Sequence, residues 1–194
     1  MPPDATPAST QTRKRGRLSR LVVSMSAVAC VALVAGTSAA AATTSHTGFG
    51  FNADSIAGFP HGEVRLTGGG AFDSATGFVH SGGGFRCITA VGQGPLMGCG
   101  ADEGVRWDTV NLMPSTMFKC TVPETARPAT TSGDTVVLLA DFYRAGDGND
   151  ESFTAPMIVS ETDLAPNIPG EQTLWIQGVG CAEAKVNFNL SAEN

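Results

Sequence analysis

Short strand-like runs alternate with turn residues along almost the whole chain after residue 42, and this pattern constrains the fold more than any other feature. Residues 63–67 (EVRLT) alternate polar and apolar side chains with a period of two, as a half-buried strand requires. Further strand-like runs, with or without this alternation, occupy 71–80, 85–88, 105–110, 116–121, 135–144, 152–160, 174–179 and 184–188. No window after residue 42 places Ala, Leu, Lys and Glu at helical spacing. We therefore expect an all-β chain of about eight to ten strands.

Two glycine runs favour one of the two common all-β architectures. Residues 68–70 and 82–84 are each three consecutive glycines, which within a strand indicate a bulge, a sharp bend or a close approach of the backbone. Their spacing fits a hairpin whose two strands both bend, as the corners of a closed barrel require. We predict an antiparallel small barrel, with a two-sheet β-sandwich as the alternative. Residues 136–140 (VVLLA) are apolar at consecutive positions, which predicts a central strand covered on both faces.

The first 42 residues have the three zones of an export signal. Residues 21–36 are apolar, residues 37–42 are small, and the basic residues that precede them are Arg13, Lys14, Arg15, Arg17 and Arg20. We expect a signal peptide over residues 1–42, a flexible segment or first edge strand over 43–62, and a single β domain over 63–194. Two alternatives stay open, which are acylation of Cys30 and an uncleaved membrane anchor.

Removal of the signal makes the chain strongly acidic. Residues 1–42 carry five of the 12 basic residues and one of the 18 acidic residues, which leaves 7 and 17, a net charge of −10. The seven remaining cations are scattered along the sequence. Such a chain should repel nucleic acid and anionic lipid, so we expect neither nucleic acid nor a membrane as a partner.

Four cysteines remain after the signal, Cys87, Cys99, Cys120 and Cys181. In an exported chain an even set indicates disulfides, for which three pairings exist. We predict Cys87 with Cys99 and Cys120 with Cys181, because the turn-rich residues 91–95 let the first pair fold back on itself. On the chain-entropy model the shorter loop contributes about 3 kcal/mol and the longer one about 4.

The most specific local cluster for a ligand is an acidic loop between two strand-like runs. Asp147, Asn149, Asp150 and Glu151 supply oxygen ligands around a glycine, which is the chemistry that Ca²⁺ prefers. The spacing begins like an EF-hand loop but lacks the glycine at its sixth position. A solvated hairpin turn is the alternative interpretation.

Other polar and aromatic residues suggest weaker hypotheses. Trp107, Trp175 and Tyr143 suit either core packing or stacking on a sugar. Four arginines lie in strand-like runs: Arg65, Arg86, Arg106 and Arg144. They are either exposed on the surface or point into the barrel, where they would bind an anionic ligand. The stretch from His80 to Gly84 is like an esterase oxyanion loop, but no G-x-S-x-G nucleophile motif accompanies it.

In composition and strand count over residues 63–188, the chain resembles the small secreted β-barrel proteins of the calycin-like kind. No family-specific motif carries the resemblance, so it assigns no functional residue.

We therefore expect a secreted, disulfide-stapled β-barrel that acts as a non-enzymatic binding module for a small, partly apolar ligand or for a cell-envelope partner. One alternative is a barrel enzyme of the cyclase or isomerase type, which would work by pocket shape and leave no linear motif. Another is a structural surface protein with no pocket. No catalytic residue and no cofactor besides Ca²⁺ is predicted, and the oligomeric state stays open.

Overall fold

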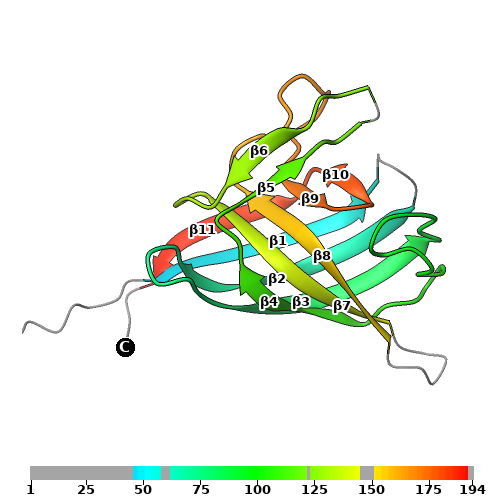
Figure 1. The fold of residues 1–194 in the computed structure, drawn as a ribbon, viewed down its shortest axis with the longest axis horizontal. Coiled ribbons are helices and arrows are strands. Elements are labelled where there is room, and N and C mark those ends of the chain that lie inside the picture. Colours follow the sequence, from blue (N-terminus) through cyan, green and yellow to red (C-terminus); the bar gives the residue numbers. More distant parts are fainter. Residues whose placement is uncertain (1–45, 58–61, 122, 145–150, 192–194) are drawn as a thin grey trace, which may run out of the picture. The chain divides into compact units, whose positions relative to one another are not determined.

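The computed structural model describes residues 46–57, 62–121, 123–144 and 151–191, all within one compact unit. These residues form eleven strands and contain no helix (Figure 1). The prediction of an all-β fold is confirmed. Within this part of the chain there is accordingly no apolar helix of membrane-spanning length.

Nine of the strands form a single antiparallel sheet in the order β10-β9-β8-β7-β4-β3-β2-β1-β11. Their bounds are β1 (His46–Ile56), β2 (Glu63–Asp73), β3 (Phe78–Thr89), β4 (Arg106–Leu112), β7 (Thr135–Arg144), β8 (Glu151–Ser160), β9 (Leu174–Ile176), β10 (Gly180–Ala182) and β11 (Lys185–Ser191). The sheet curls into a half-barrel, so that β1 contacts β9 and β10 (Figure 1). Because nine of the described strands belong to one curled sheet, the fold is a half-barrel, as the small-barrel prediction has it, rather than a two-sheet sandwich.

The two remaining strands, β5 (Ser115–Phe118) and β6 (Arg127–Thr130), form a separate antiparallel hairpin. This small sheet lies outside the half-barrel, against the outer face of β7, β8 and β9 (Figure 1). The sequence indicated a strand over 116–121 but gave no sign of a second sheet.

The segment before residue 62 contributes a full strand. Residues 43–62 were expected to form a flexible segment or a first edge strand, and the structure has β1 from His46 to Ile56, bonded to β2 on one side and β11 on the other. The strand forms because inward and outward side chains alternate along it. Phe49, Phe51 and Ala53 point inward, and the residues between them are small or polar. One of those residues is a glycine, so the alternation is hard to see in the sequence. The strand is therefore internal to the sheet rather than at its edge.

Aromatic rings fill the concave side of the sheet. Phe51 packs against Trp107 with ring centroids 5.9 Å apart, and Phe85 packs against Phe142 at 5.0 Å. Each buried aromatic ring removes roughly 150–250 Å² from water, so this cluster accounts for a large part of the hydrophobic stabilisation. Trp107 is a core residue with no exposed surface, and its sugar-stacking interpretation was wrong.

Strand β7 is buried on both faces, as residues 136–140 predicted. Val136, Leu138 and Ala140 belong to the cluster inside the half-barrel. Val137 points the other way, into a second cluster that includes Ile158 and residues of the small sheet. Continuous apolar sequence is typical of such doubly covered strands.

The glycine runs lie in straight register inside β2 and β3, with Gly68, Gly69 and Gly70 opposite Gly83, Gly82 and Ser81. The pairing shifts at Glu63/Val64 and not at the glycines, so the expectation of a bulge there was wrong. The close-approach interpretation was right, because a Cβ on Gly83 would lie 1.9 Å from the carbonyl oxygen of Thr67.

Trp107 occupies the space that the inward-facing glycine leaves. A Cβ on Gly68 would lie 2.6 Å from Cζ2 of the Trp107 ring, and the ring Nε1 donates a hydrogen bond of 3.0 Å to the Thr67 carbonyl oxygen. The missing side chain lets the large ring pack directly on the strand backbone. The glycines therefore shape the sheet around one tryptophan.

The turn between β2 and β3 follows the prediction for residues 71–80. Asp73 ends β2, and its carboxylate accepts hydrogen bonds from the Ala75 amide at 2.8 Å and the Thr76 hydroxyl at 2.8 Å. Gly77 has φ of 75° and its amide donates to the Asp73 carbonyl oxygen. The hydroxyl of Thr76, and next the Ala75 amide, hold the pKa of Asp73 below its ordinary value.

Both predicted disulfides are present. Cys87 is bonded to Cys99 with Cα atoms 6.3 Å apart, and Cys120 to Cys181 with Cα atoms 5.1 Å apart. Intrachain disulfides of this kind are typical of extracellular proteins.

Candidate functional site

A small pocket opens on the surface between β5 and the turn that joins β9 to β10. Its volume is about 220 Å³, and its lining residues are Met117, Phe118, Lys119, Ala126, Trp175, Gln177 and Gly178. The pocket therefore lies where the small sheet meets the end of the half-barrel.

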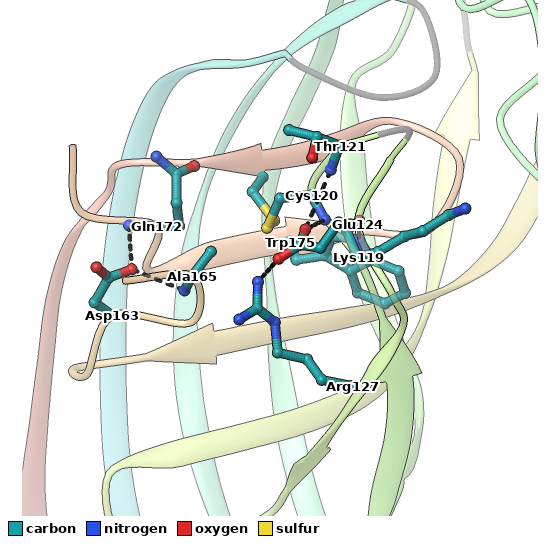
Figure 2. A network of polar contacts seen from close by, with 10 residues as sticks. Lys119, Cys120, Thr121, Glu124, Arg127, Asp163, Ala165, Gln172 and Trp175 are labelled. Carbon is teal, nitrogen blue, oxygen red and sulfur yellow. Dashed lines mark hydrogen bonds and ion pairs between the residues drawn. A yellow bond between two sulfur atoms is a disulfide. The ribbon is translucent and has the colours of Figure 1, made fainter. Parts of the chain in front are cut away.

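Two aromatic rings form the apolar wall of this pocket. Phe118 and Trp175 meet edge to face with ring centroids 5.9 Å apart, and both side chains are almost completely buried. The indole Nε1 of Trp175 donates a hydrogen bond of 3.1 Å to the Lys119 carbonyl oxygen (Figure 2). Because the only polar atom of the indole is already bonded, the ring offers a ligand an apolar surface.

Glu124 fixes the chain that leaves β5. Its Oε2 accepts hydrogen bonds from the backbone amides of Cys120 at 2.8 Å and Thr121 at 3.4 Å, and its other oxygen pairs with Arg127 (Figure 2). The Arg127 guanidinium also lies over the Phe118 ring, 5.4 Å from its centroid. One carboxylate thus joins the two ends of the loop from β5 to β6.

The disulfide between Cys120 and Cys181 ties the same loop to β10. Cys120 directly follows Lys119, and Cys181 pairs in register with Trp175 across β9 and β10. The covalent bond therefore holds two walls of the pocket together, and walls that are rigid before binding lose little entropy when a ligand arrives.

The loop between β8 and β9 contributes to the same hydrophobic cluster as the aromatic wall. Asp163 accepts hydrogen bonds from the amides of Ala165 at 2.9 Å and Gln172 at 3.0 Å, which closes the loop on itself (Figure 2). Ala165 is fully buried in the same cluster as Phe118 and Trp175. The loop and the two aromatic rings therefore belong to one hydrophobic cluster.

The mouth of the pocket combines one exposed apolar side chain with polar ones. Met117 is 57% exposed, which is high for a methionine. Methionine adapts its shape to different apolar partners. Lys119 and Gln177 also line the pocket, and the exposed Gln177 brings a hydrogen-bond donor. The arrangement can hold an apolar group against the rings and a polar group at the rim.

The predicted calcium loop lies mostly outside the residues that the structure describes. Asp147, Asn149 and Asp150 lie outside the described residues. Glu151 begins β8, where its backbone pairs with Arg144. Among the residues that are described, no group of three or more His, Cys, Asp or Glu side chains could hold a metal ion.

The four strand arginines lie outside the core. Arg65, Arg86 and Arg106 are exposed, and the hypothesis that they point into the barrel was wrong. Arg144 lies at one end of the sheet, where its Nη1 donates a hydrogen bond of 2.7 Å to the Gly98 carbonyl oxygen and its Nε lies 3.3 Å from Glu103. Tyr143 lies beneath Arg106, whose guanidinium carbon is 4.7 Å from the ring centroid.

Sequence reasoning singled out only Trp175 among the residues that line the pocket, and it favoured core packing. Core packing is confirmed, because Trp175 is only 5% exposed and belongs to the second hydrophobic cluster. The predicted Cys120–Cys181 bridge was the one signal that could have found the site, because it places the end of β5 beside β10. No local pattern marks Phe118 or Gln177.

Fold and site together define a disulfide-stapled all-β half-barrel with a small, mainly apolar surface pocket. No family model matches the chain, and no curated protein or solved structure matches it either.

Proposed function

We propose that this protein is a secreted, non-enzymatic binding module that holds the apolar end of a small ligand in the pocket between β5 and the β9–β10 turn. The observation that carries the proposal is the pair of buried rings, Phe118 and Trp175, which line an open hollow together with an exposed methionine. Apolar walls with a few polar groups at the rim are typical of ligand sites.

The size of the pocket limits what can enter. About 220 Å³ is below the roughly 300–1,000 Å³ of pockets that enclose drug-sized ligands. A single ring or a short acyl chain fits, with the rest of the ligand outside. The exposed amide of Gln177 favours a ligand whose outer end carries a hydrogen-bond acceptor.

The packed interior favours this surface site over a ligand inside the barrel. Phe51, Phe85 and Trp107 are part of an aromatic cluster on the concave side of the sheet. A cyclase or isomerase that encloses its substrate would need that space. Secretion is supported by the signal-like N-terminus and by the two disulfides.

The test uses 1-anilinonaphthalene-8-sulfonate as a probe, because it joins aromatic rings to one acidic group. We expect saturable binding that shifts the NMR signals of the Trp175 indole and the Gln177 side chain. Ala126→Leu fills the pocket from an exposed position and should weaken binding about tenfold or more, by steric exclusion. Ala101→Leu, at another exposed position outside the pocket, is the matched control.

Two results would overturn the proposal. One is the absence of saturable shifts at Trp175 and Gln177 in the wild-type protein. The other is equal binding by the Ala126→Leu and Ala101→Leu variants, which would place the probe elsewhere.

A further inference from the structure

Two arginines are cross-strand neighbours on the outer side of the half-barrel. Arg65 on β2 and Arg86 on β3 are direct partners in the antiparallel register, and both are exposed. Side chains at such positions have Cβ atoms about 4.5–5.5 Å apart, so like charges there repel each other and destabilise the strand pair. This arrangement is unexpected in a chain that carries only seven basic residues after the signal.

The two guanidiniums are not equally neutralised. Arg65 forms an ion pair with Asp54, with 2.7 Å between Nη2 and Oδ1. Arg86 has no ion-pair or hydrogen-bond partner among the described residues. Two cations with one carboxylate leave a local excess of one positive charge.

A hollow lies directly beside this pair. Its volume is about 340 Å³, and its lining residues are Arg65, Thr67, Gly84, Phe85 and Arg86. Thr67 and Gly84 are the next outward-facing partners along the same two strands. Gly84 leaves the floor open because it has no side chain, and a Cβ placed there would lie 3.1 Å from the Thr67 hydroxyl oxygen.

We propose that this hollow binds the singly charged phosphate group of a soluble molecule. Arg86 supplies the uncompensated charge, and a guanidinium pairs with phosphate oxygens through two parallel hydrogen bonds. Arg65 and Thr67 line the hollow from the neighbouring strand, and the Arg65 guanidinium keeps donors beyond the one that pairs with Asp54. A carboxylate has two oxygens, and a single guanidinium can bind both of them. A tetrahedral phosphate has more oxygens, so donors from three side chains suit it better.

The source of the phosphate is a soluble molecule because the chain after the signal has a net charge of −10. An anionic membrane surface repels such a protein over a Debye length, whereas a single small anion experiences mainly the local charge of the hollow. The hollow shares no lining residue with the pocket at Trp175, so this inference does not depend on the proposed function.

The test is a titration with inorganic phosphate at about pH 5.5, where the singly charged form predominates, with chloride keeping the ionic strength constant. Nitrogen-15 NMR should give saturable shifts of the Arg86 side-chain Nε–H and of the Thr67 and Gly84 amides. Arg86→Gln should weaken binding about tenfold or more, because a charge-assisted pair is lost. Gly84→Ala should also weaken it, since the methyl group narrows the floor.

Arg106→Gln is the matched control. Arg106 is an exposed arginine on the next strand, paired in register with Gly84, but its guanidinium turns toward the Tyr143 ring and Asp108 and does not line the hollow. Its loss should change the affinity by less than about twofold. A loss as large as that of Arg86→Gln, or no saturable shift in the wild-type protein, would overturn the inference. Co-sedimentation with vesicles of phosphatidylglycerol and phosphatidylcholine would overturn the soluble source.

Discussion

The carboxylate of Glu161 accepts a hydrogen bond of 2.6 Å from the backbone amide of Phe188. Phe188 lies in β11, an edge strand of the nine-stranded sheet. One side of β11 pairs with β1, and the other side is the edge of the sheet. Glu161 directly follows β8, and its own amide is held by the Asp134 carbonyl oxygen at 2.9 Å. An acidic side chain from just beyond the end of β8 thus covers a backbone donor on the edge strand β11. Unpaired edge donors are templates for pairing with another chain.

Glu161→Ala should expose this edge. We expect a loss of about 1 kcal/mol in the free energy of unfolding from the missing charged acceptor, together with concentration-dependent self-association. Size-exclusion chromatography with light scattering measures the association. Glu171→Ala, which removes an exposed carboxylate from the loop before β9, is the control. Identical elution of both variants across the concentration range would contradict the role of Glu161 at the edge.

Gly83→Ala should destabilise the fold strongly. Its Cβ would lie 1.9 Å from the Thr67 carbonyl oxygen and 2.5 Å from the Gly68 Cα, and both are backbone atoms that cannot rotate away. We expect a loss of about 2–4 kcal/mol in urea unfolding. Gly133→Ala, where nothing lies within 4 Å of the added methyl, should change stability by no more than about 0.5 kcal/mol. A small effect at both positions would show that β2 and β3 are not packed this closely.

Replacing Cys120 and Cys181 by alanine should cost more than replacing Cys87 and Cys99. The first bond closes a loop with a sequence separation of 61 and the second one of 12, so the chain-entropy model gives about 4 and 3 kcal/mol. Only the first double variant should also weaken probe binding at Trp175, since that bond joins two walls of the pocket. Urea unfolding and the probe titration measure both effects. The reverse order of stability losses would contradict the entropic account.

Local signals in the sequence were sufficient for much of the fold. The consecutive apolar residues 136–140 predicted a doubly covered strand, and Val137 and Leu138 do point into opposite clusters. The punctuation at Asp73 and Gly77 predicted the turn that they form. In each case the determining interaction lies within a few residues, so sequence pattern alone encodes it.

The pocket and the arginine hollow depend instead on pairings between distant segments. Phe118 and Trp175 are 57 positions apart in the printed sequence, and only the folding of the small sheet onto β9 brings them together. Arg65 and Arg86 become neighbours through the β2–β3 register, which the glycine runs obscured because glycine has no side chain to show which face it occupies. Strand register and sheet packing are properties of the whole chain.

Asp73 should make the fold more stable at neutral than at acid pH. The Thr76 hydroxyl and the Ala75 amide bond to its charged form, so its pKa in the folded state lies below the ordinary value of 3.8. Since the folded pKa is lower than the unfolded one, this stabilisation is complete above the unfolded pKa and is lost as the pH falls through the folded pKa. Carbon-13 NMR of the Asp73 carboxyl should give a pKa below 3.8 in the wild-type protein and a higher one in Thr76→Ala, where the largest cause is removed. Thr89→Ala, at an exposed position at the end of β3, should leave the Asp73 pKa unchanged. An Asp73 pKa that is the same in wild-type protein and Thr76→Ala would mean that the turn hydrogen bond does not stabilise the charged carboxylate in solution.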